Sequence, residues 1–355
     1  MNKHNKSAEY SSGLKNVLIV DDIAKNIDLL KGILSDHYHI QIAKSGKMAL
    51  KIIESKAPDI ILLDIMMPEM NGFEVCRRLK SNPETAEIPV IFLTALTDMT
   101  HEKEGFEVGC VDFITKPISP LTTLARVETH LKIYENHLNN KQLIKLRTKE
   151  LDSLLTSAIG MLADVGHLND TDTGVHMWRM ADYSAALAKG IGWDEADVDL
   201  LQLAAPLHDT GKVGIADAIL KSPNKLTEEE WVSMRKHPDI GYQILSKSEA
   251  PLFKLASTVA FGHHEKWDGS GYPLGLSGEA IPIAARIVAL ADVFDALTME
   301  RSYKKSWPIE EALQYIKDNS GTHFDPMLVD SFIKIKDEIY SIKAKWNKLE
   351  LQENS

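Results

Sequence analysis

Hydrophobic and polar positions divide the chain into two regions that differ in periodicity. From residue 14 to about residue 118, short apolar runs alternate with segments whose apolar residues have the three- and four-residue spacing of one helix face. We expect strands at 17–20, 40–43, 60–63, 90–93 and 111–114. Strands that alternate with helices pair in parallel, because each helix carries the chain back across the sheet. The pattern predicts an α/β domain with a doubly wound, parallel, five-stranded sheet.

A long helical pattern follows this first region. It runs from Pro120 to about Val165 and contains no glycine or proline before Gly160. Such a helix can pair with its copy in a coiled coil, or it can lie as a single amphipathic helix on the next domain. The register is interrupted around residues 141–145. The apolar positions with the helical spacing are Leu124, Val127, Leu131, Tyr134, Leu138, Leu151, Leu155, Ala158, Leu162 and Val165.

Beyond residue 151 the apolar spacing is helical, and no segment shows the alternation of a strand. A chain of 355 residues is long enough for about two domains. We therefore expect an α/β domain over residues 14–134, a helical signalling linker over 119–165 and an all-α domain over 151–355.

Charge and cysteine content exclude several classes of protein. The 40 lysines and arginines stand against 51 aspartates and glutamates, and the net charge of −11 opposes binding to DNA, RNA or an anionic bilayer. Cys76 and Cys110 have no partner at metal-ligand spacing, so neither a disulfide scaffold nor a thiolate site is expected. The N-terminus lacks an apolar signal segment, and no run reaches the ~18 apolar residues of a membrane span. We expect a cytoplasmic protein.

Polar residues fall at the carboxyl ends of the expected strands. Asp21 and Asp22 end the first strand, Asp64 the third and Thr94 the fourth, while Lys116 follows the fifth. Ligands of doubly wound sheets bind at this edge. Three carboxylates repel one another unless a hard cation lies among them, and an all-oxygen site suits Mg²⁺. One carboxylate can then attack a phosphoryl group whose oxygens are stabilised by the metal, the lysine and a hydroxyl.

These residues lie in the strings VLIVDD, LLDIMMPEMNG, FLTA and FITKP, through which residues 14–134 resemble the receiver domains of response regulators. The resemblance implies a flavodoxin-like fold and a histidine kinase as phosphodonor. It makes Asp64 the phosphoacceptor, Asp21 and Asp22 further ligands of Mg²⁺, and Lys116 the partner of the phosphoryl group.

Thr94 and Phe113 are the pair that the resemblance assigns to a conformational switch. Thr94 would move toward the phosphoryl oxygens and Phe113 would fill the space that it leaves. A charge change at Asp64 would thus become a packing change on the last strand and helix of the domain. Taken alone, the two residues are explained equally well by simple core packing.

A second group of candidate functional residues lies in the helical region. A lone histidine in a helix is usually a core or surface residue, but an unpaired, ionised Asp292 in the apolar stripe RIVALADVFDAL would be costly. Five imidazoles and three carboxylates suit two divalent metals, with Fe, Mn, Ni, Co and Zn all admissible. Two metals can promote phosphodiester hydrolysis by activating a hydroxide. The candidate ligands are Asp172, His176, His208, Asp209, His237, His263, His264 and Asp292.

From about Leu155 to Phe332 the chain resembles the HD-GYP branch of the HD metal-dependent phosphohydrolases. The matching strings are TGVH, HDTGK, KSPNKLTEEE, HHEKWDGSGYP, ADVFDAL and RSYK. The resemblance implies cyclic di-GMP as substrate, pGpG or GMP as product, and metal ligation by the eight residues above, with Fe or Mn favoured. Members with a third metal carry a glutamate where this chain has the shorter Asp172, so we expect two metals.

The same resemblance identifies residues that would act on the substrate. Lys212, one helical turn after His208, would point at the scissile phosphate and share the catalytic role with Asp209. Arg301 and Lys304 would face a second phosphate, unless they belong to a solvated basic patch. The loop that names the family would contact the substrate, a partner protein or only the core. Its residues are Gly269, Gly271, Tyr272 and Pro273.

We therefore expect a homodimeric response regulator that hydrolyses cyclic di-GMP under the control of phosphorylation at Asp64. One alternative is a catalytically weak adaptor that binds cyclic di-GMP or diguanylate cyclases through the GYP loop. Another is an HD phosphohydrolase that acts on a different signalling nucleotide. The complete ligand set argues against the adaptor, because a binding protein has no need of Lys212 and all five histidines.

Overall fold

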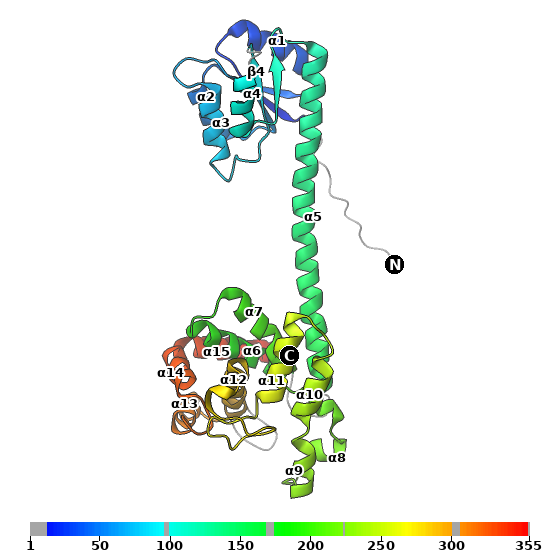
Figure 1. Ribbon diagram of the computed structural model, residues 1–355, viewed down its shortest axis with the longest axis vertical. Coiled ribbons are helices and arrows are strands. Elements are labelled where there is room, and N and C mark those ends of the chain that lie inside the picture. The colour runs from blue at the N-terminus through cyan, green and yellow to red at the C-terminus, as the bar shows by residue number, and fades with distance from the viewer. Residues whose placement is uncertain (1–12, 96–98, 168–173, 223, 300–305, 354–355) are drawn as a thin grey trace. The chain divides into compact units, whose positions relative to one another are not determined.

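The computed structural model describes residues 13–95, 99–167, 174–222, 224–299 and 306–353. The chain divides into two compact units, residues 1–148 and 149–355, and helix α5 (Pro120–His167) passes from one into the other (Figure 1). Each unit has its own hydrophobic core.

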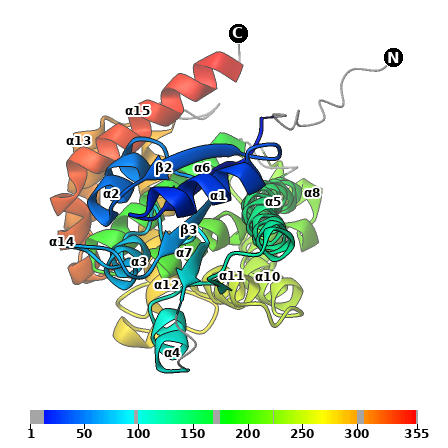
Figure 2. The same ribbon diagram turned by 90° about the horizontal axis from the view of Figure 1, so that it is seen from above.

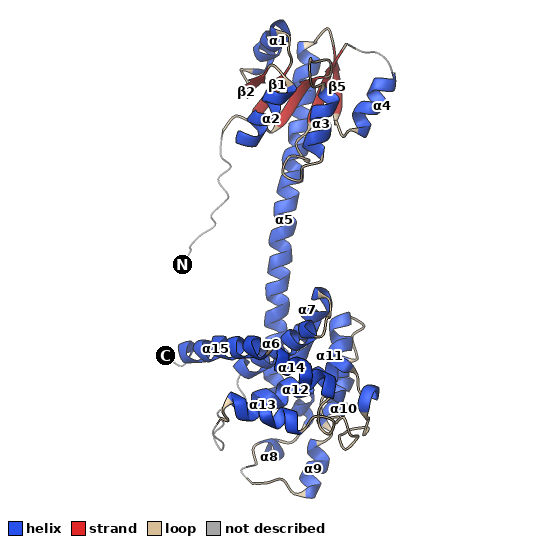
Figure 3. Cartoon of the chain, turned by 90° about the vertical axis from the view of Figure 1, so that its left-hand side faces the viewer, coloured by secondary structure: helices blue, strands red, loops and turns tan. Residues whose placement is uncertain are grey.

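The first unit is built around a five-stranded sheet in which every neighbouring pair of strands is parallel (Figure 3). The strand order is β2-β1-β3-β4-β5, with β1 (Asn16–Val20), β2 (His39–Ala43), β3 (Ile60–Asp64), β4 (Val90–Thr94) and β5 (Asp112–Thr115). The helices that connect them are α1 (Ala24–Leu34), α2 (Gly46–Ser55), α3 (Gly72–Lys80) and α4 (Met99–Glu107). The predicted doubly wound fold is confirmed.

Helices cover both faces of this sheet. Helices α1 and α5 cover one face, and α2 and α3 cover the other (Figure 2). Leu30 and Val127 pack on the first face, and Ala49 and Val75 pack on the second. β3 and β4 lie inside the sheet and are buried along their whole length, which explains their unbroken apolar sequence. Since β1 and β3 are neighbours in register, the residues at their carboxyl ends meet at one edge.

The second unit is helical, as predicted. Its longer helices are α6 (Gly174–Gly190), α7 (Glu195–Ala204), α10 (His237–Leu245), α11 (Pro251–Gly262), α12 (Ile283–Thr298), α13 (Ile309–Asp318), α14 (Pro326–Lys334) and α15 (Lys336–Glu353). The short ones are α8 (Asp217–Leu220), α9 (Glu228–Met234) and the 3-10 turns η1 (Ala205–Leu207), η2 (Thr210–Gly214) and η3 (Gly278–Ala280). Within the described part of this unit, β pairing is limited to one isolated bridge, Ser320 with Phe324.

The core of the helical unit lies between α6, α12 and α14. The rings of Tyr183, Phe294 and Phe332 meet edge to face there, with centroids 5.3 and 5.1 Å apart. Their packing places α6 and α12 side by side, and both helices carry candidate ligands on adjoining faces. The expected helix-on-helix architecture therefore also positions the site.

Helix α5 is the long helix that the sequence predicts. Its C-terminal part packs on the helical unit through Ile159 and Ala163, which share a core with Met177 and Leu207. Pairing of α5 with a second copy stays a prediction. In the described part of the chain, no helix, α5 included, has both the length and the apolarity of a membrane span.

Candidate phosphoacceptor site and metal centre

Three aspartates meet at the carboxyl edge of the sheet. Asp64 is the last residue of β3 and Asp21 follows β1, and both are buried, while Asp22 is exposed. One oxygen of each lies within 4.8 Å of the others. Lys116, just after β5, places Nζ 3.0 Å from Asp21 Oδ2 and 3.0 Å from Asp64 Oδ1. The predicted set is thus brought together, and its oxygens suit a hard cation.

Burial and charge oppose each other at this edge. Burial raises the pKa of Asp64, although hydrogen bonding to Lys116 opposes the shift. Burial alone lowers the pKa of Lys116, but hydrogen bonds and charge from Asp64 and Asp21 outweigh it, and the net shift is upward. Asn26, which sequence reasoning missed, donates to both oxygens of Asp21 at 3.0 and 2.9 Å. The positively charged ammonium of Lys116 is therefore held beside Asp64.

Thr94 and Phe113 face the same side of the sheet. Phe113 of β5 pairs with Phe92 of β4, and Thr94 lies two residues further along β4. Both residues are buried, and the Phe113 ring lies 5.8 Å from Phe92 and 5.1 Å, edge-on, from Phe106. Core packing thus accounts for the present position of Phe113, and the switch role stays a prediction.

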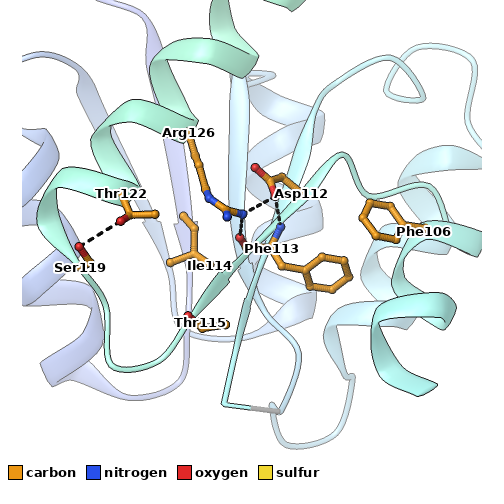
Figure 4. Close-up of a pocket in the computed structure, with 8 residues that line it drawn as sticks. All are labelled: Phe106, Asp112, Phe113, Ile114, Thr115, Ser119, Thr122 and Arg126. Atoms are coloured by element: carbon orange, nitrogen blue, oxygen red, sulfur yellow. Dashed lines mark hydrogen bonds and ion pairs between the residues drawn. The ribbon is translucent and has the colours of Figure 1, made fainter. Parts of the chain in front are cut away.

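A pocket of about 280 Å³ adjoins Phe113 on this side of the unit (Figure 4). Arg126 of α5 donates both to Asp112 and to the carbonyl oxygen of Phe113. Asp112 in turn accepts from the backbone N–H of Phe113 at 2.8 Å and lies 3.1 Å from Nε2 of His130. Arg126 therefore holds the Phe113 backbone directly, and His130 is connected to it only through the Asp112 carboxylate.

The candidate ligands of the helical unit come from five separate segments. His176 lies on α6, His208 and Asp209 stand between η1 and η2, His237 begins α10, His263 and His264 follow α11, and Asp292 lies on α12. Gly211 lets η2 approach α10, because a Cβ there would lie 1.9 Å from the carbonyl oxygen of His237. This close contact brings Asp209 next to His237.

Imidazoles surround the carboxylate of Asp209. Oδ1 lies 3.3 Å from Nε2 of His237 and 3.6 Å from Nε2 of His263, and Oδ2 lies 3.2 Å from Nε2 of His208. One donor atom from each of Asp209, His237, His263 and His264 lies within 4.8 Å of the other three. These residues, distant in sequence, form one possible metal site.

The backbone sets the orientation of three of these rings. Nδ1 of His208 lies 2.9 Å from the carbonyl oxygen of Ala205, and Nδ1 of His237 lies 2.8 Å from that of Met234. Nδ1 of His263 lies 3.0 Å from the carbonyl oxygen of Ala260. A carbonyl oxygen only accepts, so Nδ1 carries the proton and Nε2 keeps its lone pair. Each Nε2 is therefore in the form that binds a metal.

Burial favours the same neutral form. It lowers the pKa of His237 to about 4, and the neighbouring His263 adds to the shift while Asp209 opposes it. It also lowers the pKa of His264 well below its usual value, with His263 and His237 adding to the effect. Neutral imidazoles beside one carboxylate fit the preferences of a borderline divalent metal.

His176 and Asp292 form a second pair of donors, with Nε2 of the histidine 3.7 Å from Oδ1 of the aspartate. The Asp292 side chain is 24% exposed, so it is not the deeply buried aspartate that its apolar sequence suggested. That position belongs to Asp295, one helical turn later, which is fully buried. The sequence prediction assigned the desolvation cost to the wrong aspartate of α12.

Asp295 and Arg179 are functional candidates that sequence reasoning missed. Asp295 accepts from Nδ1 of His176 and from Nε and Nη2 of Arg179, at 2.5 and 2.9 Å for the arginine. Burial raises the pKa of Asp295, but the charges and hydrogen bonds of these two partners outweigh it and lower the pKa. A signal was present in the sequence, since each lies three residues from a candidate ligand on the same helix.

Lys212 lies in η2 with Nζ 2.8 Å from Oδ2 of Asp209. The lysine therefore stands at the candidate metal centre, where the resemblance expected it. Its predicted contact with a scissile phosphate stays a prediction.

The GYP loop folds back against the metal centre. Tyr272 stacks on His264 with ring centroids 4.7 Å apart and planes at 25°. A Cβ on Gly271 would lie 2.4 Å from the backbone nitrogen of Lys266 and 2.6 Å from Glu265 Cα, so only glycine fits there. The Tyr272–Pro273 peptide bond is cis. Tyr272 therefore contacts a candidate metal ligand, and its contact with the substrate or a partner protein stays a prediction.

Glu265 anchors this loop and was also missed. Its buried carboxylate accepts from the backbone N–H groups of Leu274 at 2.8 Å and Leu276 at 3.0 Å. Three other candidates, Asp172, Arg301 and Lys304, lie outside the described residues.

Two family models match the chain, the response regulator receiver domain over residues 17–128 and the HD domain over residues 133–328. The chain belongs to the response regulators that carry an HD domain. A "Probable cyclic di-GMP phosphodiesterase" of Vibrio cholerae is 42% identical over 352 residues, which cover 93% of this chain and 80% of that protein.

Two further relatives of this HD-domain response regulator share most of its length. "Cyclic di-GMP phosphodiesterase response regulator RpfG" of Xanthomonas campestris is 36% identical, covering 94% of this chain and 90% of its own. A "Cyclic di-GMP phosphodiesterase" of Thermotoga maritima is 35% identical, covering 86% of each chain. The HD domain implies divalent metal binding, and the donors around Asp209 supply a site for it.

Proposed function

We propose that this HD-domain response regulator hydrolyses cyclic di-GMP to linear pGpG, and that phosphorylation of Asp64 controls the reaction. The observation that carries the proposal is the meeting of three histidine donors with the carboxylate of Asp209 within 4.8 Å. Neutral imidazoles beside a carboxylate are a divalent-metal site of the kind that phosphodiester hydrolysis uses. The names of the three relatives supply the substrate.

The metal ligands in this proposal are divided between two divalent metals. Fe or Mn is favoured, and Ni, Co and Zn are admissible. When bound, the metals supply Lewis acidity that lowers the pKa of water and neutralises charge on a phosphodiester. Asp172 is retained as an eighth candidate. The seven described ligands are His176, His208, Asp209, His237, His263, His264 and Asp292.

Lys212 has two tasks in this proposal. Its ammonium donates to Oδ2 of Asp209, which leaves Oδ1 directed at His237 and His263. It also places a fixed positive charge beside the ligands, where charge develops on the phosphate oxygens during hydrolysis. Arg301 and Lys304 are assigned to the second phosphate of the cyclic substrate, and the loop residues Gly271, Tyr272 and Pro273 line the substrate side of the metal centre.

Regulation begins at the carboxyl edge of the sheet. A histidine kinase transfers a phosphoryl group to Asp64, while Asp21, Asp22 and Asp64 hold Mg²⁺ and Lys116 neutralises the new charge. Thr94 and Phe113 convert this charge into a change of packing at β5. Because Arg126 of α5 holds the Phe113 backbone, the change reaches the helix that enters the HD domain. Homodimerisation and binding of diguanylate cyclases are further proposals.

The test uses the full chain loaded with Mn²⁺ or Fe²⁺ under anaerobic conditions. Cyclic di-GMP, a cyclic dinucleotide with one adenine, and a guanosine polyphosphate are incubated with it, and His208→Ala serves as the control. We expect pGpG from cyclic di-GMP and none with His208→Ala. Faster hydrolysis of another nucleotide would show that this nucleotide is the substrate. Tight binding of cyclic di-GMP without hydrolysis would support the alternative function as an adaptor.

A further inference from the structure

We propose that Arg235, which lies over the rings of Trp231 and Tyr272, reads the guanine edge of the nucleotide bound at the metal centre. The inference rests on the proposed function, because it adds a base-binding subsite to the same site. Trp231 lies on α9, Arg235 follows that helix, and Tyr272 belongs to the GYP loop. No motif in the sequence connects the three.

Contacts between side chains connect the candidate metal centre to α9. Tyr272 stacks on the candidate ligand His264 at 4.7 Å. Cζ of Arg235 lies 5.7 Å from the Tyr272 ring centroid, and it lies 5.9 Å from the Trp231 ring centroid. Both distances are within the range of a cation–π contact. The Arg235 guanidinium thus contacts two aromatic rings, and one of these rings stacks on the candidate ligand His264.

The exposed guanidinium of Arg235 is accessible to a ligand. Cζ of Arg235 lies over both rings, and Arg235 and Trp231 are exposed, with Trp231 at 40%. Among the described residues, no carboxylate pairs with Arg235. A planar fork of N–H donors matches two acceptors side by side, and guanine presents such a pair in O6 and N7. Adenine has an amino donor in place of O6, so the same fork repels it.

A phosphate would also accept from this fork, but the position favours a base. Arg235 contacts Tyr272 and, within the described part of the chain, no candidate ligand, whereas Lys212 lies 2.8 Å from Asp209 and already supplies a cation at the metal centre. Two aromatic rings at one site give a surface on which a purine can stack. A nucleotide with its phosphate at the metals would extend its base toward these rings.

The test compares Arg235→Ala with Lys236→Ala, which removes the same charge from the next, exposed residue. Full-length, Mn²⁺-loaded protein is used to measure kcat and KM for cyclic di-GMP and binding of GMP and AMP by calorimetry. A lost bidentate contact weakens guanine binding on the order of tenfold or more. We expect Arg235→Ala to raise the KM for cyclic di-GMP and to weaken GMP binding by this factor, while AMP affinity stays unchanged. Lys236→Ala should behave like wild type. Trp231→Leu should give a smaller loss, because it removes one of the two rings.

Each remaining outcome has a defined meaning. Equal losses for GMP and AMP would show that Arg235 binds phosphate and would overturn the guanine assignment, as would an Arg235→Ala variant indistinguishable from Lys236→Ala. If wild-type protein prefers GMP through Arg235 but hydrolyses no cyclic dinucleotide, the base subsite stands and the proposed function fails. Retained helix content and Mn²⁺ stoichiometry in the variants separate a loss of binding from a loss of fold.

Discussion

Asp295 accepts a hydrogen bond from Nδ1 of His176, and the same carboxylate is held by Arg179 with Nε at 2.5 Å and Nη2 at 2.9 Å. All three side chains are buried. The bond directs Nε2 of His176 toward Asp292, 3.7 Å away. A carboxylate behind a ligating histidine fixes its tautomer and raises its basicity. We therefore predict that Asp295 positions His176 for the proposed metal centre.

Asp295→Asn should weaken divalent metal binding by roughly 10- to 100-fold, the usual cost of losing such a partner. It should also lower the free energy of unfolding by about 3–5 kcal/mol, because Arg179 is left buried without an opposite charge. The measurements are a Mn²⁺ titration with metal analysis of the purified protein, and urea unfolding.

Asp182→Asn is the matched control for this variant. Asp182 lies on α6, the helix that carries His176 and Arg179, and accepts from Lys345 and Trp346 at 2.9 and 2.8 Å, away from the candidate ligands. We expect its metal affinity to equal that of wild type. Wild-type metal affinity in Asp295→Asn, with the unfolding energy lowered, would leave Asp295 a purely structural role.

Lys212→Met should reduce kcat on the order of 10²- to 10³-fold, since it removes a fixed cation from the site of charge development. Bound metal should stay at the wild-type amount, because the ligand set is intact. Lys221→Met is the control, as it removes an exposed lysine whose surface pair with Asp217 at 3.1 Å contributes little. An unchanged kcat in Lys212→Met would remove the lysine from the chemistry.

Asp64→Ala should abolish both phosphorylation by acetyl phosphate and any effect of that phosphodonor on hydrolysis. Asp64 lies 3.0 Å from Lys116, whereas both oxygens of the neighbouring Asp21 already accept from Asn26 at 3.0 and 2.9 Å, so the variant removes the predicted phosphoacceptor. Intact-protein mass spectrometry measures phosphorylation, and pGpG formation measures the response. The exposed Asp36→Asn variant should behave as wild type. A response that survives in Asp64→Ala would disconnect the receiver domain from the output.

The helical unit should lose stability in mild acid partly through His323. Burial lowers the pKa of His323 to about 4, with Lys266 adding to the shift and Asp268 opposing it. The unfolded chain therefore binds a proton on this residue at higher pH than the folded chain does. The contribution of His323 to the free energy of unfolding is complete above its pKa in the unfolded chain, about 6.5, and is lost as pH falls toward 4.

His323→Gln should accordingly show a smaller drop in unfolding free energy between pH 7 and pH 5 than wild type. Tryptophan fluorescence can follow the helical unit alone, because all 6 tryptophans lie beyond residue 148. Equal slopes for the two proteins over this range would contradict the prediction.

The local pattern of apolar and polar residues was enough to predict the fold of each region and most of the candidate residues. The apolar runs predicted each strand to within one residue. The inner strands β1, β3 and β4 have unbroken apolar runs because they are buried on both faces, whereas the edge strands β2 and β5 are partly exposed. Asp21, Asp64 and Lys116 followed from strand order, since parallel strands present their carboxyl ends at one edge. The ligand set of the helical unit came from residue type and family resemblance.

Packing between distant segments decided what local pattern could not. Whether Asp292 or Asp295 is the buried aspartate depends on which neighbour each faces, and Arg179 reaches Asp295 only through the contact of α6 with α12. The orientation of His237 is set by a backbone carbonyl, and the Arg235 contact with Tyr272 joins two loops far apart in sequence. Periodicity reports which face of an element is apolar, whereas these contacts depend on distances that only the folded chain defines.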